Sequence, residues 1–221
     1  MTTSLVAPQL QTLSSIKQRI DSQIDDLIAA LPDPKDLTSE QRRGIIARYT
    51  AVLEGNFIYW MTAAYLSTQS DEARPIIIDN LREEVGECHP EMLRRFAIAA
   101  NAFPTDADAF AVRDSLAKVR MYLGRMSGVH NLLTMGYFET YIQRFMSYLG
   151  DLAVAQGSKD LEYTDVHGVC DIAHSEGLLM ALSAEAAITP PDPSADLFEG
   201  VDLLHTLILE INNTAPASEA K

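Results

Sequence analysis

Apolar residues recur at intervals of three and four along almost the whole chain, and this spacing constrains the fold more than any other feature. It matches the 3.6-residue period of an α-helix and differs from the alternation of a half-buried strand. Proline and glycine interrupt the pattern at Pro32, Gly86, Pro104, Gly157 and Pro190, where they end helices. The sequence therefore predicts an all-α fold, a single bundle of about seven to eight helices. The expected helices cover residues 9–31, 38–65, 70–84, 90–103, 105–126, 128–155, 163–186 and 194–211.

The size and apolar content of the chain favour one domain. Its 221 residues are 47% apolar, which is enough to bury a substantial core. We expect a single helical domain over residues 1–213. The last segment, 214–221, is small and polar, and we expect it to be a disordered tail.

The charge balance excludes two classes of partner. With 17 Lys+Arg against 31 Asp+Glu, the net charge is −14. Such a chain cannot neutralise nucleic-acid phosphates, and it is repelled by anionic membranes. No run of 18 apolar residues predicts a membrane span, and the first residues do not resemble a secretory signal. We expect a cytoplasmic protein.

The segment HGVCDIAH contains the sharpest chemical motif, with His167, Asp171 and His174 at intervals of four and three. Because four and seven residues turn a helix by about 400° and 700°, Asp171 and His174 lie within about 40° of His167. Two imidazoles and a carboxylate on one helix face are a ligand set for Fe, Mn or Zn. The alternative is a polar helix face that is rich in histidine by chance.

A second candidate pair is Glu84 and His89. Five residues on a regular helix would place them about 140° apart, too far to share a metal ion. Gly86 lies between them, so Glu84 can end one helix while His89 begins the next and both turn inward. The alternative is that this acidic segment, which also contains Glu83 and Glu87, is a solvated surface.

Glu139 is a lone acid inside a long apolar run. A carboxylate that faces the core must be paired, protonated or bound to metal. The alternative is an exposed glutamate paired with Arg144.

The remaining histidines are weaker candidates. Asp202 and His205 share a helix face, but Phe198 stands where a further ligand would be needed, so we interpret the pair as structural. His130 lies on the face opposite Glu139, which favours a core or surface role. Phosphate-binding glycine loops, paired CxxC motifs and nucleophile elbows are not found.

Along the chain, Glu84 and His89 come first, Glu139 follows on a long helix, and the motif from His167 to His174 comes last on the next helix. In this chain order, the three candidate stretches resemble the heme-oxygenase-like diiron oxidases and oxygenases. The central segment is similar to the typical one of that family at Asn80-Leu81, Glu83-Glu84, Gly86, His89-Pro90, Leu93 and Arg94-Arg95-Phe96. The resemblance covers roughly residues 38–186. It implies two iron ions held by Glu84, His89, Glu139, His167, Asp171 and His174, with Glu139 bridging both. The loop between Glu84 and His89 is shorter than in many relatives, which leaves Glu83 as an alternative ligand to Glu84.

The resemblance also implies a non-heme diiron enzyme that activates O₂ as co-substrate. Family members hydroxylate amines, desaturate or cleave amino acids, and decarboxylate fatty acids. We favour a small amino-acid-like metabolite, whose carboxylate would need a cation such as Arg120, Arg125 or Arg144. A fatty acid in an apolar tunnel is the alternative. A second alternative is a metal-free TENA/PqqC-like enzyme of the same fold, in which Cys88 or Cys170 would be the nucleophile. A non-catalytic interaction bundle and a homodimer also remain open.

Overall fold

The computed structural model describes residues 6–192 and 194–215, and the described chain is all-helical with no β-strand, as expected. The prediction of a disordered tail falls mostly on residues 216–221, which lie outside the described residues. The helices are α1 (Val6–Ala29), α2 (Ser39–Ser67), α3 (Ala73–Gly86), α4 (His89–Ala99), α5 (Asp106–Leu123), α6 (Gly128–Ala155), α7 (Glu162–Ile188) and α8 (Glu199–Ile211).

Several helix ends follow directly from the residues that cap them. Thr38 and Thr105 precede α2 and α5, and each forms a capping box with the residue three positions later. Gly157 follows α6 with φ of +90°, a left-handed conformation that favours glycine. Two expected helix boundaries were wrong. α4 stops at Ala99 rather than near Phe103, and α8 begins at Glu199 rather than at Ser194.

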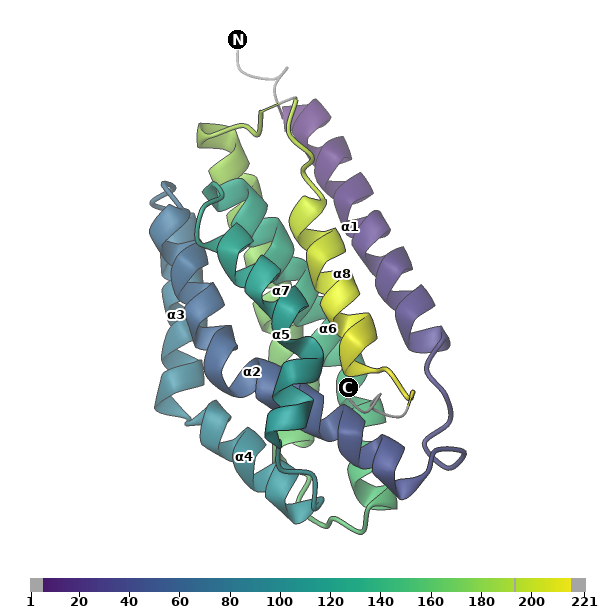
Figure 1. Ribbon diagram of the computed structural model, residues 1–221. Coiled ribbons are helices and arrows are strands. Elements are labelled where there is room, and N and C mark those ends of the chain that lie inside the picture. Colours follow the sequence, from purple (N-terminus) through teal and green to yellow (C-terminus); the bar gives the residue numbers. More distant parts are fainter. Residues whose placement is uncertain (1–5, 193, 216–221) are drawn as a thin grey trace.

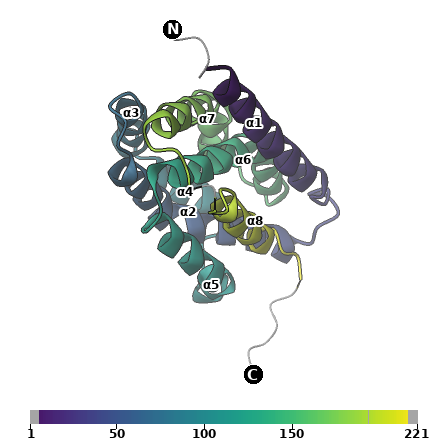
Figure 2. The same cartoon turned by 90° about the horizontal axis from the view of Figure 1, so that it is seen from above.

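α6 lies at the centre of the bundle and is surrounded by the other helices, as the view from above shows (Figure 2). Its side chains are buried on nearly every face, including Leu132, Phe138, Phe145 and Leu149. It packs most extensively against α7 and then against α2. A polar side chain that projects from the middle of α6 is therefore held deep inside the molecule.

The site described below depends on how α3, α4 and α7 surround α6 (Figure 1). α3 and α4 are joined by a two-residue turn in which Cys88 adopts a left-handed conformation with φ of 57°. α3 packs closely on α7, where a Cβ added to Gly177 would lie 3.0 Å from Cγ2 of Ile76. Among the described helices, none has the length and apolarity needed to cross a membrane.

Candidate metal centre

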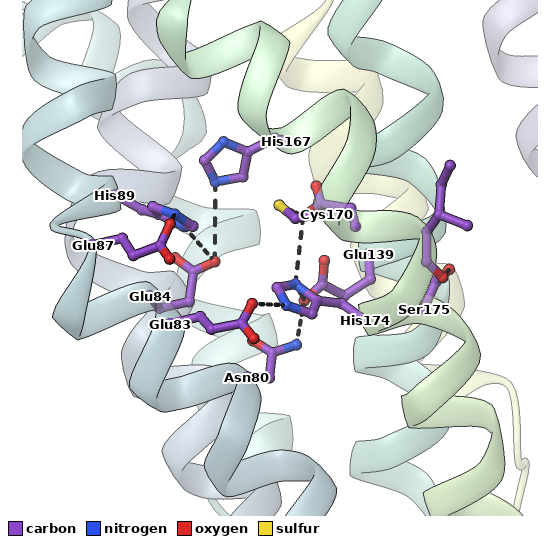
Figure 3. Close-up of polar contacts among 12 residues, drawn as sticks. Asn80, Glu83, Glu84, Glu87, His89, Glu139, His167, Cys170, His174 and Ser175 are labelled. Atoms are coloured by element: carbon purple, nitrogen blue, oxygen red, sulfur yellow. Dashed lines mark hydrogen bonds and ion pairs between the residues drawn. The ribbon is translucent and has the colours of Figure 1, made fainter.

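The six residues singled out in the sequence are all buried inside the bundle. Figure 3 shows Glu84, His89, Glu139, His167 and His174 close together, and Asp171 contacts His174. None is more than 8% exposed, although three are carboxylates and three are imidazoles. They come from four helices: Glu84 from α3, His89 from α4, Glu139 from α6, and His167, Asp171 and His174 from α7. Buried ionisable groups are costly unless they are paired or bind metal, so this concentration requires a physical explanation.

Glu84, His89 and His167 form one half of the cluster. Glu84 Oε1 lies 3.0 Å from Nδ1 of His89 and 4.0 Å from Nε2 of His167. One potential ligand atom from each of the three lies within 4.8 Å of the others. The turn at Gly86 and Cys88 brings Glu84 and His89 together, as the sequence predicted, because it ends α3 and starts α4 in a new direction.

The ring of His167 is oriented by a backbone hydrogen bond. Its Nδ1 lies 2.8 Å from the carbonyl oxygen of Tyr163. Because a carbonyl only accepts, Nδ1 must carry the proton, and in the neutral ring Nε2 keeps a lone pair directed towards Glu84. Burial lowers the pKa of His167, which favours this neutral form. Metal-ligating histidines are typically held in this way through their other nitrogen.

Asp171, His174 and Glu139 form the other half. Nδ1 of His174 lies 3.6 Å from Oδ1 of Asp171 and 4.0 Å from Oε1 of Glu139. On its other side, Nε2 of His174 lies 2.7 Å from Oε2 of Glu83. A carboxylate on the outer nitrogen directs the inner nitrogen towards the cluster.

The two neighbouring glutamates of α3 therefore face different halves of the cluster. Glu84 is buried beside His89 and His167, whereas Glu83 is half-exposed and contacts His174. Glu83 is thus not placed as a substitute for Glu84. Its position is that of a residue that orients a histidine.

The electrostatics of the cluster reflect burial and crowded negative charge. Burial raises the pKa of Glu139 well above its usual range, and the neighbouring carboxylate of Asp171 adds to the effect. Burial opposes protonation of His174, but its hydrogen bond to Glu83, the nearby carboxylate of Asp171 and the charge of Glu139 outweigh it and raise its pKa to about 9. In the absence of a cation, these groups thus share protons to reduce their repulsion.

The unsatisfied atoms of the cluster fit a bound metal. Oδ2 of Asp171 and Nδ1 of His174 are buried and have no hydrogen-bond partner within residues 6–192 and 194–215. Two ligand atoms about 2.1 Å from one ion lie about 3.0–3.4 Å apart, close to several separations found here. Asn80 donates to Oε1 of Glu139 at 3.0 Å and holds that carboxylate in place.

A small cavity borders the cluster. It has a volume of about 20 Å³, which is room for roughly one water molecule. Glu84, His89, Glu139, His167 and Asp171 line it together with Tyr163, and the rest of its lining is an apolar wall from α2, α4 and α6. This wall consists of Leu53, Phe57, Ile58, Pro90, Leu93 and Ile142.

Other sequence candidates lie elsewhere. His130 is buried and contacts Ser127, and His205 contacts Tyr137, as expected for structural histidines. The proposed Glu139–Arg144 pair was wrong, because Arg144 binds Asp21 and Asp25 on α1.

The arginines expected to hold a substrate carboxylate do not line the cavity. Arg144 is engaged on α1, Arg120 lies over the ring of Tyr59, and Arg125 is exposed. Sequence could not settle this point, because only packing decides which side chains face inward, and Arg125 lies in the turn between α5 and α6.

Tyr163 was missed by the sequence reasoning, and Cys170 was considered only in another role. Tyr163 lines the cavity, and its ring lies 4.1 Å from that of His167. Its position one helical turn before His167 was the available signal. Cys170, noted only as a possible nucleophile, lies against Asp171.

No known protein-family model matches the chain. A comparison with curated proteins finds no match either. What the site does is therefore inferred from its own residues.

Proposed function

We propose that this protein is a non-heme diiron enzyme that uses O₂ to oxidise a small organic substrate. The observation that carries the proposal is the clustering of three buried imidazoles and three buried carboxylates, of which all but His174 line one cavity. Two ferrous ions bound there would supply the electrons and open coordination positions that O₂ activation requires.

Each half of the cluster would hold one ion. Glu84, His89 and His167 would bind the first, and Asp171 with His174 the second. Glu139 would bridge them, since it approaches His174 and lines the same cavity as Glu84. Three carboxylates offset three of the four positive charges, which leaves about +1 and removes the repulsion within the cluster.

The surrounding residues would orient the ligands and exclude water. Tyr163 and Glu83 fix the rings of His167 and His174 through their outer nitrogens, and Asn80 fixes Glu139. The apolar wall of the cavity keeps bulk water away from the reacting groups. Such a site protects a reactive oxidant from side reactions with solvent.

The apolar wall supports a substrate with a hydrocarbon chain. Arg120, Arg125 and Arg144 are all absent from the cavity lining, so a substrate carboxylate of either class finds no arginine there. An amino acid carries an ammonium group as well, for which the six side chains of the apolar wall offer no acceptor. A fatty acid presents a chain that matches Leu53, Phe57 and similar side chains. We therefore favour a fatty-acid-like substrate over an amino-acid-like one.

A metal-free enzyme with a cysteine nucleophile is less well supported. Burial and the neighbouring carboxylates raise the pKa of the Cys170 thiol far above its usual range, which suppresses the reactive thiolate. Cys88 is exposed and does not line the cavity.

Iron binding tests the proposal. Anaerobic titration with Fe(II) should give close to two ions per chain, and His89→Ala or His167→Ala should weaken binding by well over about ten-fold. His130→Ala is the matched control, since it removes a buried imidazole outside the cluster. Wild-type iron content in both His89→Ala and His167→Ala, or less than one ion in the wild type, would refute the proposal.

A further inference from the structure

Cys170 lies within the second half of the cluster, and the six-residue ligand set gives it no role. It is half-buried on α7, and Figure 3 shows it beside the site, on the same helix as His174. Cys170 and His174 are four residues apart, which places them on one face of the helix. The sulfur therefore has access to the same space as the imidazole.

The distances among Cys170, Asp171 and His174 are compatible with all three binding one metal ion. The Cys170 thiol donates to Oδ1 of Asp171, with Sγ and Oδ1 3.2 Å apart. One potential ligand atom from each of Cys170, Asp171 and His174 lies within 4.8 Å of the others. A sulfur about 2.3 Å and an oxygen about 2.1 Å from the same ion lie about 3.1–3.6 Å apart at usual coordination angles. The observed separation falls within this range.

A second observation points independently to a ligand at this position. The side chains of Asp171 and His174 are both more than nine-tenths buried, with exposed fractions of 1% and 8%. The atoms concerned are Oδ2 of Asp171 and Nδ1 of His174. Neither atom has a hydrogen-bond partner in the described part of the chain. Carboxylate oxygens and imidazole nitrogens are both metal-ligand atoms, and both belong to residues that group with Cys170.

We propose that Cys170 is a ligand of the second metal ion, with Asp171, His174 and Glu139. This inference rests on the proposed function, since it assigns one further donor to a half-site already described. Coordination would form a metal–sulfur bond and break the S–H bond, whose proton leaves to solvent. No electron is transferred in this step.

The proposal makes the two halves chemically different. Glu84, His89 and His167 offer nitrogen and oxygen donors, whereas the second half adds a thiolate. Thiolates favour borderline ions such as Zn²⁺, Co²⁺ and Fe²⁺ over the harder Mg²⁺ and Mn²⁺. The second half should therefore select its metal more strictly than the first.

Cobalt substitution tests the proposal directly. Full-length protein is titrated anaerobically with Co(II), and the near-ultraviolet sulfur-to-cobalt charge-transfer band is followed together with the bound cobalt. The wild type should develop this band, and Cys170→Ser should lose it and bind one of its two ions about ten-fold or more weakly. Cys88→Ser is the matched control and should behave as the wild type, because Cys88 is exposed and outside both ligand groups.

A second measurement avoids dependence on the variant folding. X-ray absorption of the Zn(II)-loaded wild type should contain a sulfur shell at about 2.3 Å besides nitrogen and oxygen at about 2.0–2.2 Å. Two bound ions without any sulfur signal would overturn the assignment of Cys170 and leave the dinuclear site intact. Failure to bind cobalt or zinc at all would overturn both. Loss of the band in Cys88→Ser alone would also reject Cys170 as the ligand.

Discussion

The two ring nitrogens of His174 have different surroundings, and this difference sets how the second ion would bind. Nε2 contacts Glu83, whereas Nδ1 faces Asp171 and Glu139. Hydrogen bonds and nearby negative charge raise the pKa of His174 to about 9 against the effect of burial, so at neutral pH the metal-free ring carries both protons. A metal at Nδ1 must displace one of them.

Metal affinity should therefore increase with pH. Below about pH 9 the His174 proton competes with the ion, which alone makes the affinity of the second half rise by up to about ten-fold per pH unit between pH 6 and 8, and release of the Cys170 proton on coordination would steepen this rise. In the first half, burial lowers the pKa of His167, whereas hydrogen bonds to Glu84 and Glu87 outweigh burial and raise the pKa of His89, so this half also releases a proton when it binds an ion. Competitive Zn(II) titrations at several pH values measure how the affinity of each half depends on pH. The same titrations of His174→Ala show how much of this dependence comes from the His174 proton. Affinities that do not change with pH would contradict the protonation assigned to His174.

At the residue scale, the sequence predicted the candidate cluster but not the separate roles of its neighbours. His167, Asp171 and His174 could be found because helix geometry alone places residues four and seven apart on one face. Glu83 and Glu84 could not be distinguished, since adjacent residues differ by about 100° on a helix and only the packing of α3 on α7 shows which one is buried. The orientation of Arg144 was likewise decided by α1, a helix distant in sequence.

At the scale of elements, α7 carries three of the six cluster residues and contains two glycines that differ in their surroundings. A Cβ added to Gly168 would make an ordinary contact, 3.8 Å from Cβ of Met146. A Cβ added to Gly177 would lie only 3.0 Å from Cγ2 of Ile76. Gly177 thus allows α3 to approach α7, whereas Gly168 only makes the helix less stable.

Gly168→Ala should stabilise the protein by about 0.5–1 kcal/mol, because alanine loses less backbone entropy in a helix interior. Gly177→Ala should gain less or lose stability, since Ile76 must move. Urea denaturation of the two variants and the wild type measures the free energies of unfolding. A destabilised Gly168→Ala, or an equal gain at Gly177, would contradict this account of α7.

The helices themselves were largely predictable, because their caps act locally. Thr38, Thr105 and Gly157 all cap or end the helices at which they were expected. The C-terminal end of α4 and the start of α8 were less predictable, because Pro104 and Ser194 show only where a helix can end or begin, and tertiary packing determines where these helices stop and start. The all-α class was predictable because it depends on the 3.6-residue period of the apolar residues and not on the exact ends of the helices.

At the scale of the whole molecule, the cavity is too small for the substrate proposed for it. About 20 Å³ accommodates one water molecule, so a hydrocarbon chain requires α4 and α2 to separate. Ile58 on α2 and Pro90 on α4 are both half-buried and line the cavity, so we expect a substrate to enter between these helices. α4 is also the shortest helix among the described residues, with 11 residues.

Once an iron-loaded enzyme is available, octanoate and 2-aminooctanoate distinguish the two substrate classes, because they share chain length and carboxylate and differ only in the ammonium group. We expect octanoate to accelerate O₂ consumption about ten-fold or more over 2-aminooctanoate, since placing an ammonium against the apolar wall costs at least about 1–3 kcal/mol without a partner. An oxygen electrode measures both rates on the same preparation, with substrate-free enzyme as the reference. Faster consumption with 2-aminooctanoate would show that the ammonium finds a carboxylate partner near the wall, and it would restore the amino-acid class in place of the fatty acid.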